Sequence, residues 1–166
     1  MQLLGDIAYK NLTKNEKLYI GNYTQFTAHN INSYLVNRGI GWSKGAFKKD
    51  INNIDAAIEK FTLDRPILVY KGTDAEFYKN LRVGDIFKNR IYFSTSLNQN
   101  VAEKFASLNN QPFLIELRVP KDVKGLYIGD NTEYINNQME FLIKRSSKYL
   151  VIYKDSQNMI LEVVIK

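Results

Sequence analysis

The spacing of apolar residues changes once along the chain, close to Pro66. Before that point, apolar residues recur every three to four positions, as the buried stripe of a helix requires. The clearest such residues are Ile51, Ile54, Ile58 and Phe61. A second helix is predicted over residues 30–37, ending near Gly39-Ile40-Gly41. The first third of the chain is therefore expected to be helical.

After Pro66, short β-branched or aromatic runs separated by turn residues predict strands. The runs cover residues 67–70, 86–87, 90–93, 113–119, 141–143, 149–153 and 160–165. A short helix is expected over residues 98–106, with Asn98 as its cap and Val101, Ala102 and Phe105 facing inward. Without repeats or low-complexity linkers, the pattern predicts one α+β domain over residues 1–166, helical to about 62 and β-rich from about 63.

Composition excludes several kinds of chemistry. The 166 residues contain no cysteine, so disulfides, thiol nucleophiles and cysteine metal clusters are absent. A single histidine, His29, makes histidine metal clusters and Ser-His-Asp catalysis hard to build, and no metal is expected. The formal charge of +6 suits an anionic partner, such as a dinucleotide, an acidic protein surface, nucleic acid or a membrane face.

One polar pair stands at the entry of an apolar, strand-like run. Gln138 and Glu140 are two residues apart, and side chains at that spacing on a strand share a face. Taken alone, such a pair is typical of the wet side of many strands. Two upstream segments make the pair part of a more specific pattern. They are residues 68–72, which end in a cation and a glycine, and residues 92–96, in which Ser-Thr-Ser follows two aromatic residues.

The order of these three segments resembles the mono-ADP-ribosyltransferases of the C3-exoenzyme type, whose layout is a basic residue, then Ser-Thr-Ser, then Gln-x-Glu. Residues 12–17, 23–24 and 31–35 are similar to the first two helices of that family. The resemblance implies a helical N-terminal part packed on a mixed or antiparallel two-sheet β core. It also implies cleavage of NAD and transfer of ADP-ribose to a protein side chain, with an asparagine of a Rho-family GTPase as the expected target.

The resemblance also implies a role for each motif residue. Glu140 would stabilise the cationic ribose, Ser94 would position Glu140, and Gln138 would orient the acceptor. Further residues are expected to bind NAD or to recognise the target protein. Those expected to bind NAD are Lys71, Gly72, Asn32, Arg38, Thr95 and Ser96, with Thr95 and Ser96 on the floor of the nicotinamide pocket, and Tyr134 is expected to contact the target protein.

Two positions depart from the family pattern. Lys71 stands where the family has an arginine that forks onto the NAD phosphate, and a lysine keeps the charge but loses the bidentate geometry. Val36 replaces the arginine that commonly follows the Tyr-Leu pair, and Arg38 lies two residues further on, where helical spacing turns it away from that face.

These departures leave alternatives open. One is a catalytically weak or inactive transferase-like domain that binds NAD or a protein. Another is a nucleic-acid module that uses positive charge and some of the eleven tyrosines, although no clustered basic-aromatic motif supports it. The chain is expected to be a monomer. It has neither a visible signal peptide nor an apolar run of membrane-spanning length, so the compartment stays open, and a secreted or delivered toxin is one option.

Overall fold

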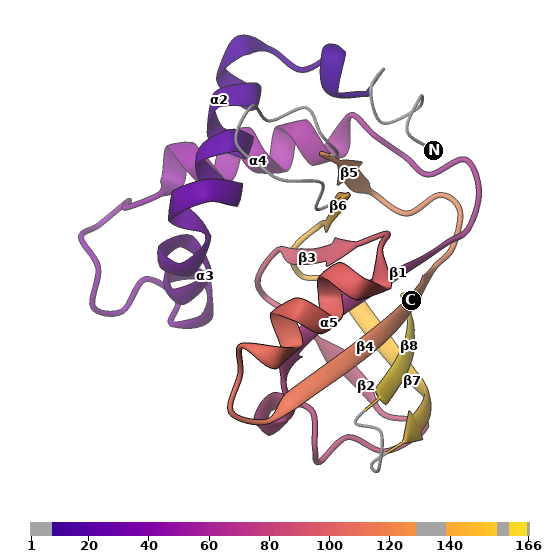
Figure 1. The fold of residues 1–166 in the computed structure, drawn as a ribbon. Helices are drawn as coiled ribbons and strands as arrows, with labels where there is room; N and C mark the ends of the chain where they lie inside the picture. The colour runs from indigo at the N-terminus through magenta and orange to yellow at the C-terminus, as the bar shows by residue number, and fades with distance from the viewer. Residues whose placement is uncertain (1–7, 129–138, 156–159, 166) are drawn as a thin grey trace.

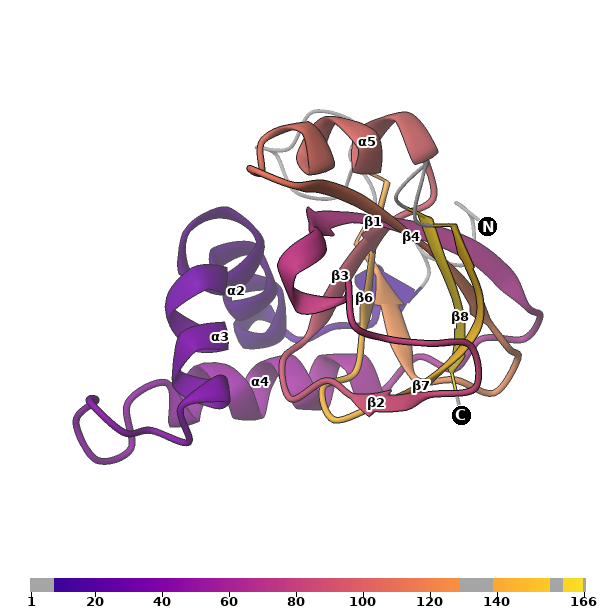
Figure 2. The ribbon, with the colours of Figure 1, turned by 90° about the horizontal axis from the view of Figure 1, so that it is seen from below.

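The helices of the first third form a layer beside the sheet in the computed structural model, which describes residues 8–128, 139–155 and 160–165 (Figures 1 and 2). They are α2 (Lys14–Asn22), the π-helical segment η1 (Tyr23–Thr27), α3 (Ala28–Val36) and α4 (Lys48–Glu59). A capping box begins α2, since the Thr13 hydroxyl accepts from the Glu16 N–H and the Glu16 carboxylate accepts from the Thr13 N–H. The Lys60 ammonium also donates to Glu16, which ties α2 to the end of α4.

The β-rich part forms a mixed sheet in the order β2-β7-β8-β4-β1-β3-β6-β5. Its strands are β1 (Ile67–Asp74), β2 (Ile86–Lys88), β3 (Phe93–Ser96), β4 (Pro112–Val119), β5 (Gly125–Tyr127), β6 (Glu140–Ile143), β7 (Lys148–Asp155) and β8 (Ile160–Ile165). Strands β4 and β8 run parallel, and the other neighbours are antiparallel. The short helix η2 (Ala75–Phe77) follows β1, and α5 (Gln99–Ser107) follows β3.

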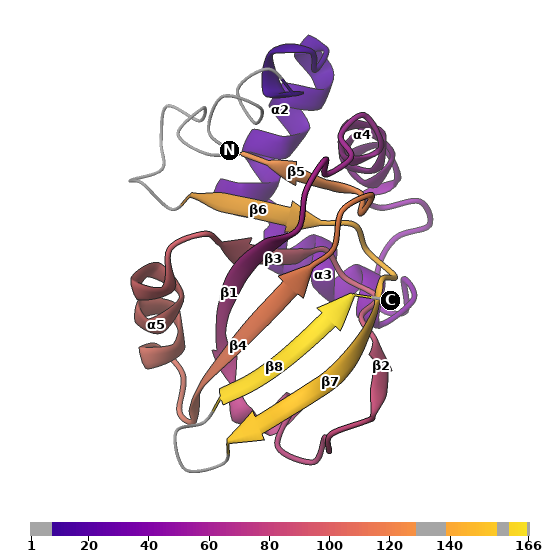
Figure 3. The same ribbon diagram turned by 90° about the vertical axis from the view of Figure 1, so that its right-hand side faces the viewer.

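The sheet divides into two portions at the contact between β1 and β3. These strands share one registered pair, Tyr70 with Ser96, whereas β1 and β4 pair over the whole of β1. Figure 3 shows β3, β6 and β5 running at a steep angle to β4, β8 and β7. The expected α+β class with a mixed two-part β core is confirmed.

Two apolar cores lie on opposite sides of β6. Phe141 and Ile143 join the core between the two portions of the sheet. Leu142, which points the other way, joins the core under the helices together with Ile54 and Ile58 of α4. Because side chains alternate along a strand, this one short strand contributes to both cores.

Glycine allows α5 to lie very close to β1. A Cβ atom added at Gly72 would stand 1.8 Å from the Ala102 carbonyl oxygen and 2.4 Å from the Ala106 nitrogen. Only a residue without a side chain fits at this point of the strand. Gly72 therefore sets the separation between β1 and the helix that follows β3.

Several sequence-based expectations need correction. Ser-Thr-Ser was expected after a strand that ends at Phe93, but these residues form β3 itself. Strand β1 continues four residues beyond Tyr70, so Lys71 lies inside it. Phe105 was expected to face inward and is 46% exposed. The three-residue strand β5 was not predicted. Within the described residues, no helix is long and apolar enough to span a membrane.

Candidate active site

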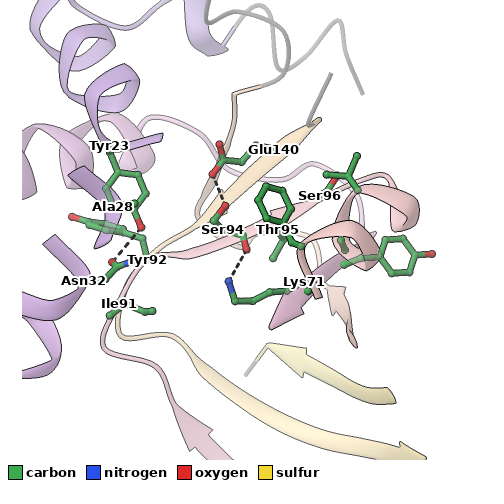
Figure 4. A pocket seen from close by; sticks show the side chains of 15 residues that line it. Tyr23, Ala28, Asn32, Lys71, Ile91, Tyr92, Ser94, Thr95, Ser96 and Glu140 are labelled. Carbon is green, nitrogen blue, oxygen red and sulfur yellow. Dashed lines mark hydrogen bonds between the residues drawn. The ribbon is translucent and has the colours of Figure 1, made fainter. Parts of the chain in front are cut away.

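A pocket of about 270 Å³ opens beside the seam where β1 meets β3, between α5 and the helical layer (Figure 4). Most of the residues predicted to bind NAD or to act in catalysis line it. These are Asn32, Lys71, Gly72, Ser94, Thr95, Ser96 and Glu140. The structure therefore brings these predicted residues together around one pocket.

Glu140 begins β6 and is 6% exposed. The Ser94 hydroxyl donates to its Oε1 at 2.5 Å from the adjacent strand β3. Burial raises the pKa of the Glu140 carboxyl, while the Ser94 hydrogen bond and the charge of Lys71 act in the opposite direction. A carboxylate in such surroundings acts on a nearby positive charge with little screening by water.

Lys71 of β1 contacts Ser94, the residue that holds Glu140. Its ammonium donates to the Ser94 carbonyl oxygen at 3.2 Å and lies 4.9 Å from the centre of the Phe93 ring. Burial lowers the pKa of Lys71 to about 8, and the Glu140 carboxylate opposes that shift. The described contacts of the Lys71 ammonium are thus with Ser94 and Phe93.

The other two residues of the Ser-Thr-Ser run hold the strand in place. The Thr95 hydroxyl donates to the Phe141 carbonyl oxygen at 2.7 Å, which ties β3 to β6. The Ser96 hydroxyl accepts from the Asn98 N–H at 3.0 Å, at the turn that leads into α5. Ser96 is also the registered partner of Glu140 across the two strands. Both residues line the pocket.

Two tyrosines form an aromatic wall that sequence reasoning did not assign to the site. The rings of Tyr23 and Tyr92 meet edge to face, with centres 5.3 Å apart. The Tyr23 hydroxyl donates to Asn32 Oδ1 at 3.2 Å, so Asn32 belongs to this wall (Figure 4). Tyr23 stands at the start of the π-helical turn η1, a type of irregularity that often marks functional sites.

The opposite wall comes from α5. Val101, Ala102 and Phe105 line the pocket there, with Phe105 partly open to solvent. Ile91, Tyr70 and Ala28 complete the lining.

The remaining predicted residues are not part of the described pocket. Arg38 is exposed, has a left-handed backbone with φ 53° after α3, and is not among the lining residues. Gln138 and Tyr134 lie outside the described residues. The backbone of Met139 is also left-handed, with φ 45°, and the ladder with β3 begins at Glu140.

The pocket can accept a cationic ring joined to a polar sugar. Its aromatic and apolar walls suit a flat ring, and the buried carboxylate suits a positive charge. A volume of about 270 Å³ is enough for one half of a dinucleotide. These properties fit the nicotinamide riboside end of NAD. In the part of the chain that is described, no group of three or more acidic or histidine side chains is placed to hold a metal ion.

The profile of the ADP-ribosyltransferase exoenzyme family matches residues 4–165. The chain belongs to this family. Its family is therefore the one that the sequence motifs predicted.

Individual ADP-ribosyltransferases resemble the chain to different extents. The NAD(+)-arginine ADP-ribosyltransferase EFV of Enterococcus faecalis is 39% identical over 118 residues, which are 69% of this chain and 23% of that protein. The chain thus spans about a quarter of the length of that curated relative. Plx2a, an ADP-ribosyltransferase toxin from Paenibacillus larvae, is 29% identical with a TM-score of 0.81, and the match covers 99% of this chain and 92% of Plx2a.

Two more distant structures share the fold. The C3 exoenzyme of Clostridium limosum is 23% identical with a TM-score of 0.79, and the match covers 99% of this chain and 92% of the exoenzyme. The toxin BECa of C. perfringens, solved with NADH, is 20% identical with a TM-score of 0.76, over 97% of this chain and 45% of BECa.

Proposed function

We propose that this domain breaks the bond between nicotinamide and ribose in NAD and transfers ADP-ribose to a protein side chain. The observation that carries the proposal is the Glu140 carboxylate, buried in the pocket and held by the Ser94 hydroxyl. When the glycosidic bond breaks, its electron pair leaves with nicotinamide, and the ribose carbon becomes electron-poor. A fixed negative charge in a poorly hydrated site stabilises that change more than it stabilises the starting state.

The other pocket residues support this reaction in different ways. The aromatic wall of Tyr23 and Tyr92 offers flat surfaces to the nicotinamide ring. Ser94 holds one oxygen of Glu140 and leaves the other available for a ribose hydroxyl. We assign Lys71 to the charge balance around Glu140 and, from inside the pocket, to the nucleotide phosphates.

The acceptor has two candidates. Gln138, by resemblance to the C3-type enzymes, supports an asparagine of a Rho-family GTPase, since a carboxamide matches an asparagine side chain in donors and acceptors. The name of the Enterococcus faecalis relative supports arginine instead. After the acceptor attacks the ribose carbon, its proton leaves and the new bond to ADP-ribose is complete. The toxins among the related structures support a role as a delivered effector.

One experiment tests both the reaction and the acceptor. The protein is incubated with labelled NAD and a cell lysate, nicotinamide release is measured, and the labelled residue is identified by mass spectrometry. Replacing Glu140 with glutamine should slow nicotinamide release by about 10²- to 10³-fold, because the charge that stabilises the cation is lost. Glu103→Gln, an exposed change on α5, serves as the control and should leave the rate unchanged.

Equal rates for Glu140→Gln and the native protein would overturn the catalytic assignment. NAD binding without nicotinamide release by the native protein would favour the inactive transferase-like alternative. Labelling confined to arginine would remove the asparagine assignment and leave the cleavage chemistry intact.

A further inference from the structure

Behind the aromatic wall, three segments meet at one side chain, Asp55 of α4. The Tyr92 hydroxyl donates to Asp55 Oδ1 at 2.8 Å, and its proton is shared with the Ile51 carbonyl oxygen at 3.2 Å. The Arg145 guanidinium donates to the same carboxylate through two nitrogens. Its Nε lies 3.0 Å from each carboxylate oxygen, and its Nη2 lies 2.6 Å from Oδ2. Such a fork fixes the carboxylate in both position and orientation.

Two of the three segments adjoin the strands of the reaction site, and the third is helix α4. Tyr92 comes directly before β3, which holds Ser94. Arg145 comes just after β6, which begins with Glu140. Asp55 belongs to α4, whose buried stripe lies in the same core as Tyr23. Asp55 therefore joins the helical layer to both strands that supply the catalytic pair.

The position of the Tyr92 ring depends on its hydroxyl. Tyr92 is 1% exposed, lines the pocket and supports Tyr23 by edge-to-face contact. Burial and then the nearby Asp55 carboxylate raise the pKa of Tyr92, so its phenol stays protonated and acts as a donor at neutral pH. A hydrogen bond from a neutral phenol to a charged, forked carboxylate is stronger than one to a neutral acceptor.

We propose that Asp55, oriented by Arg145, is a positioning residue for NAD binding: it holds Tyr92, and through it Tyr23, at the distance from Glu140 that the nicotinamide ring needs. Asp55 does not line the pocket and touches neither NAD nor the reacting atoms. The inference rests on the proposed function, because it assumes that the pocket binds NAD.

A neighbouring ion pair provides a matched control. Glu59 lies one helical turn after Asp55 on α4 and pairs with Lys144, the residue before Arg145. This pair joins the same helix to the same segment without touching the aromatic wall. A purely structural role of Asp55 would lower Tm without changing KM, which is the result expected for Glu59.

The test compares Asp55→Ala, Asp55→Asn, Tyr92→Phe and Glu59→Ala. For each variant, kcat and KM are taken from nicotinamide release, the Kd of NAD from calorimetry, and Tm from thermal unfolding. Both Asp55 variants lose the ion pair with Arg145, but asparagine keeps an oxygen that accepts from Tyr92. We expect Asp55→Ala to raise KM and Kd by about tenfold with a smaller change in kcat.

Tyr92→Phe should raise KM and Kd in the same direction. Asp55→Asn should have a KM between those of the native protein and Asp55→Ala, because the neutral amide oxygen still accepts from Tyr92 but forms a weaker hydrogen bond and is no longer oriented by Arg145. Glu59→Ala should lower Tm and leave KM unchanged. Equal KM values for Asp55→Ala and Asp55→Asn, or a native KM for Tyr92→Phe, would overturn the inference. If the native protein binds NAD without releasing nicotinamide, the proposed function fails and the Kd series still decides the role of Asp55. A native protein that does not bind NAD would overturn both.

Discussion

Two opposing effects act on the pKa of the Glu140 carboxyl. Its burial disfavours the charged form, while the Ser94 hydroxyl and the Lys71 ammonium favour it. In the proposed reaction the charged form stabilises the cationic ribose, so we expect the two supporting groups to set the fraction of active enzyme at a given pH. Ser94 acts on Glu140 directly, and Lys71 also holds the main chain of Ser94.

This balance predicts a pH effect of Ser94→Ala. Glu140 is ionised above its pKa, so nicotinamide release should fall as the pH drops through that value. Removing the hydroxyl takes away a hydrogen bond to the charged form, so the pKa rises and the acid limb of kcat/KM moves to higher pH. Ser94→Thr keeps a hydroxyl and should stay close to the native profile. An unmoved acid limb in Ser94→Ala would show that this hydrogen bond does not tune Glu140.

At the scale of single residues, the sequence could predict the residues that belong to motifs with a recognisable order along the chain. Lys71, Ser94 and Glu140 meet because three segments with recognisable patterns become neighbouring strands. The contacts of Tyr92 could not be foreseen in the same way. Its partner Asp55 is 37 positions away, and Arg145 is 90 positions from Asp55. Such pairs depend on how the helical layer docks on the sheet, which apolar spacing does not specify.

The packing of α5 on β1 is the element-level contact that shapes the pocket. Ala102 and Val101 line one wall only because Gly72 lets the helix approach the strand. The Asn98 cap, whose side chain accepts from the Asn100 N–H, fixes where that helix begins.

Gly72→Ala should therefore damage both stability and the site. A methyl group there overlaps main-chain atoms of α5, so the helix must move, at a cost of about 1–3 kcal/mol in the free energy of unfolding. Nicotinamide release should fall with it because the wall moves. Gly21→Ala is the matched control: nothing lies within 4 Å of that position in α2, and a gain of about 0.5–1 kcal/mol is expected. Denaturant titration of both variants checks the opposite signs, and an unchanged midpoint for Gly72→Ala would refute the close contact.

Element boundaries show what periodicity captures and what it misses. The spacing of Ile51, Ile54 and Ile58 predicted α4, because the apolar residues of a helix buried on one side recur every three to four positions. Ser94 to Ser96 was expected to follow a strand rather than to form one, but the hydroxyls of the three residues bond within the site and its flanking turn, and the run belongs to β3. Three residues, as in β5, are too few for a period to be visible.

On the scale of the whole molecule, the helical layer and the sheet share β6. Phe141 and Leu142 are consecutive and enter different cores, so neither core can lose this strand without disturbing the other. We propose from this sharing that residues 1–166 behave as a single folding unit. Small single domains of this size usually unfold in one step.

Two variants test whether the domain unfolds as a single unit. Ile115→Val removes a methylene from the core between the sheet portions, and Ile54→Val does so under the helices, each at about 0.5–1.5 kcal/mol. Trp42, the single tryptophan, lies in the helical part against Phe47. In both variants, the midpoints from its fluorescence and from far-UV circular dichroism should fall together. Two separate units would leave the tryptophan midpoint of Ile115→Val at its native value.

The left-handed backbone at Met139 marks the point where β6 begins. The registered ladder with β3 starts at Glu140, and Met139 adds one hydrogen bond beyond it, since its carbonyl oxygen accepts from the Leu97 N–H at 3.1 Å. The position of Glu140 in the site is thus set by the strand pairing that begins with it and by the one bond from Met139.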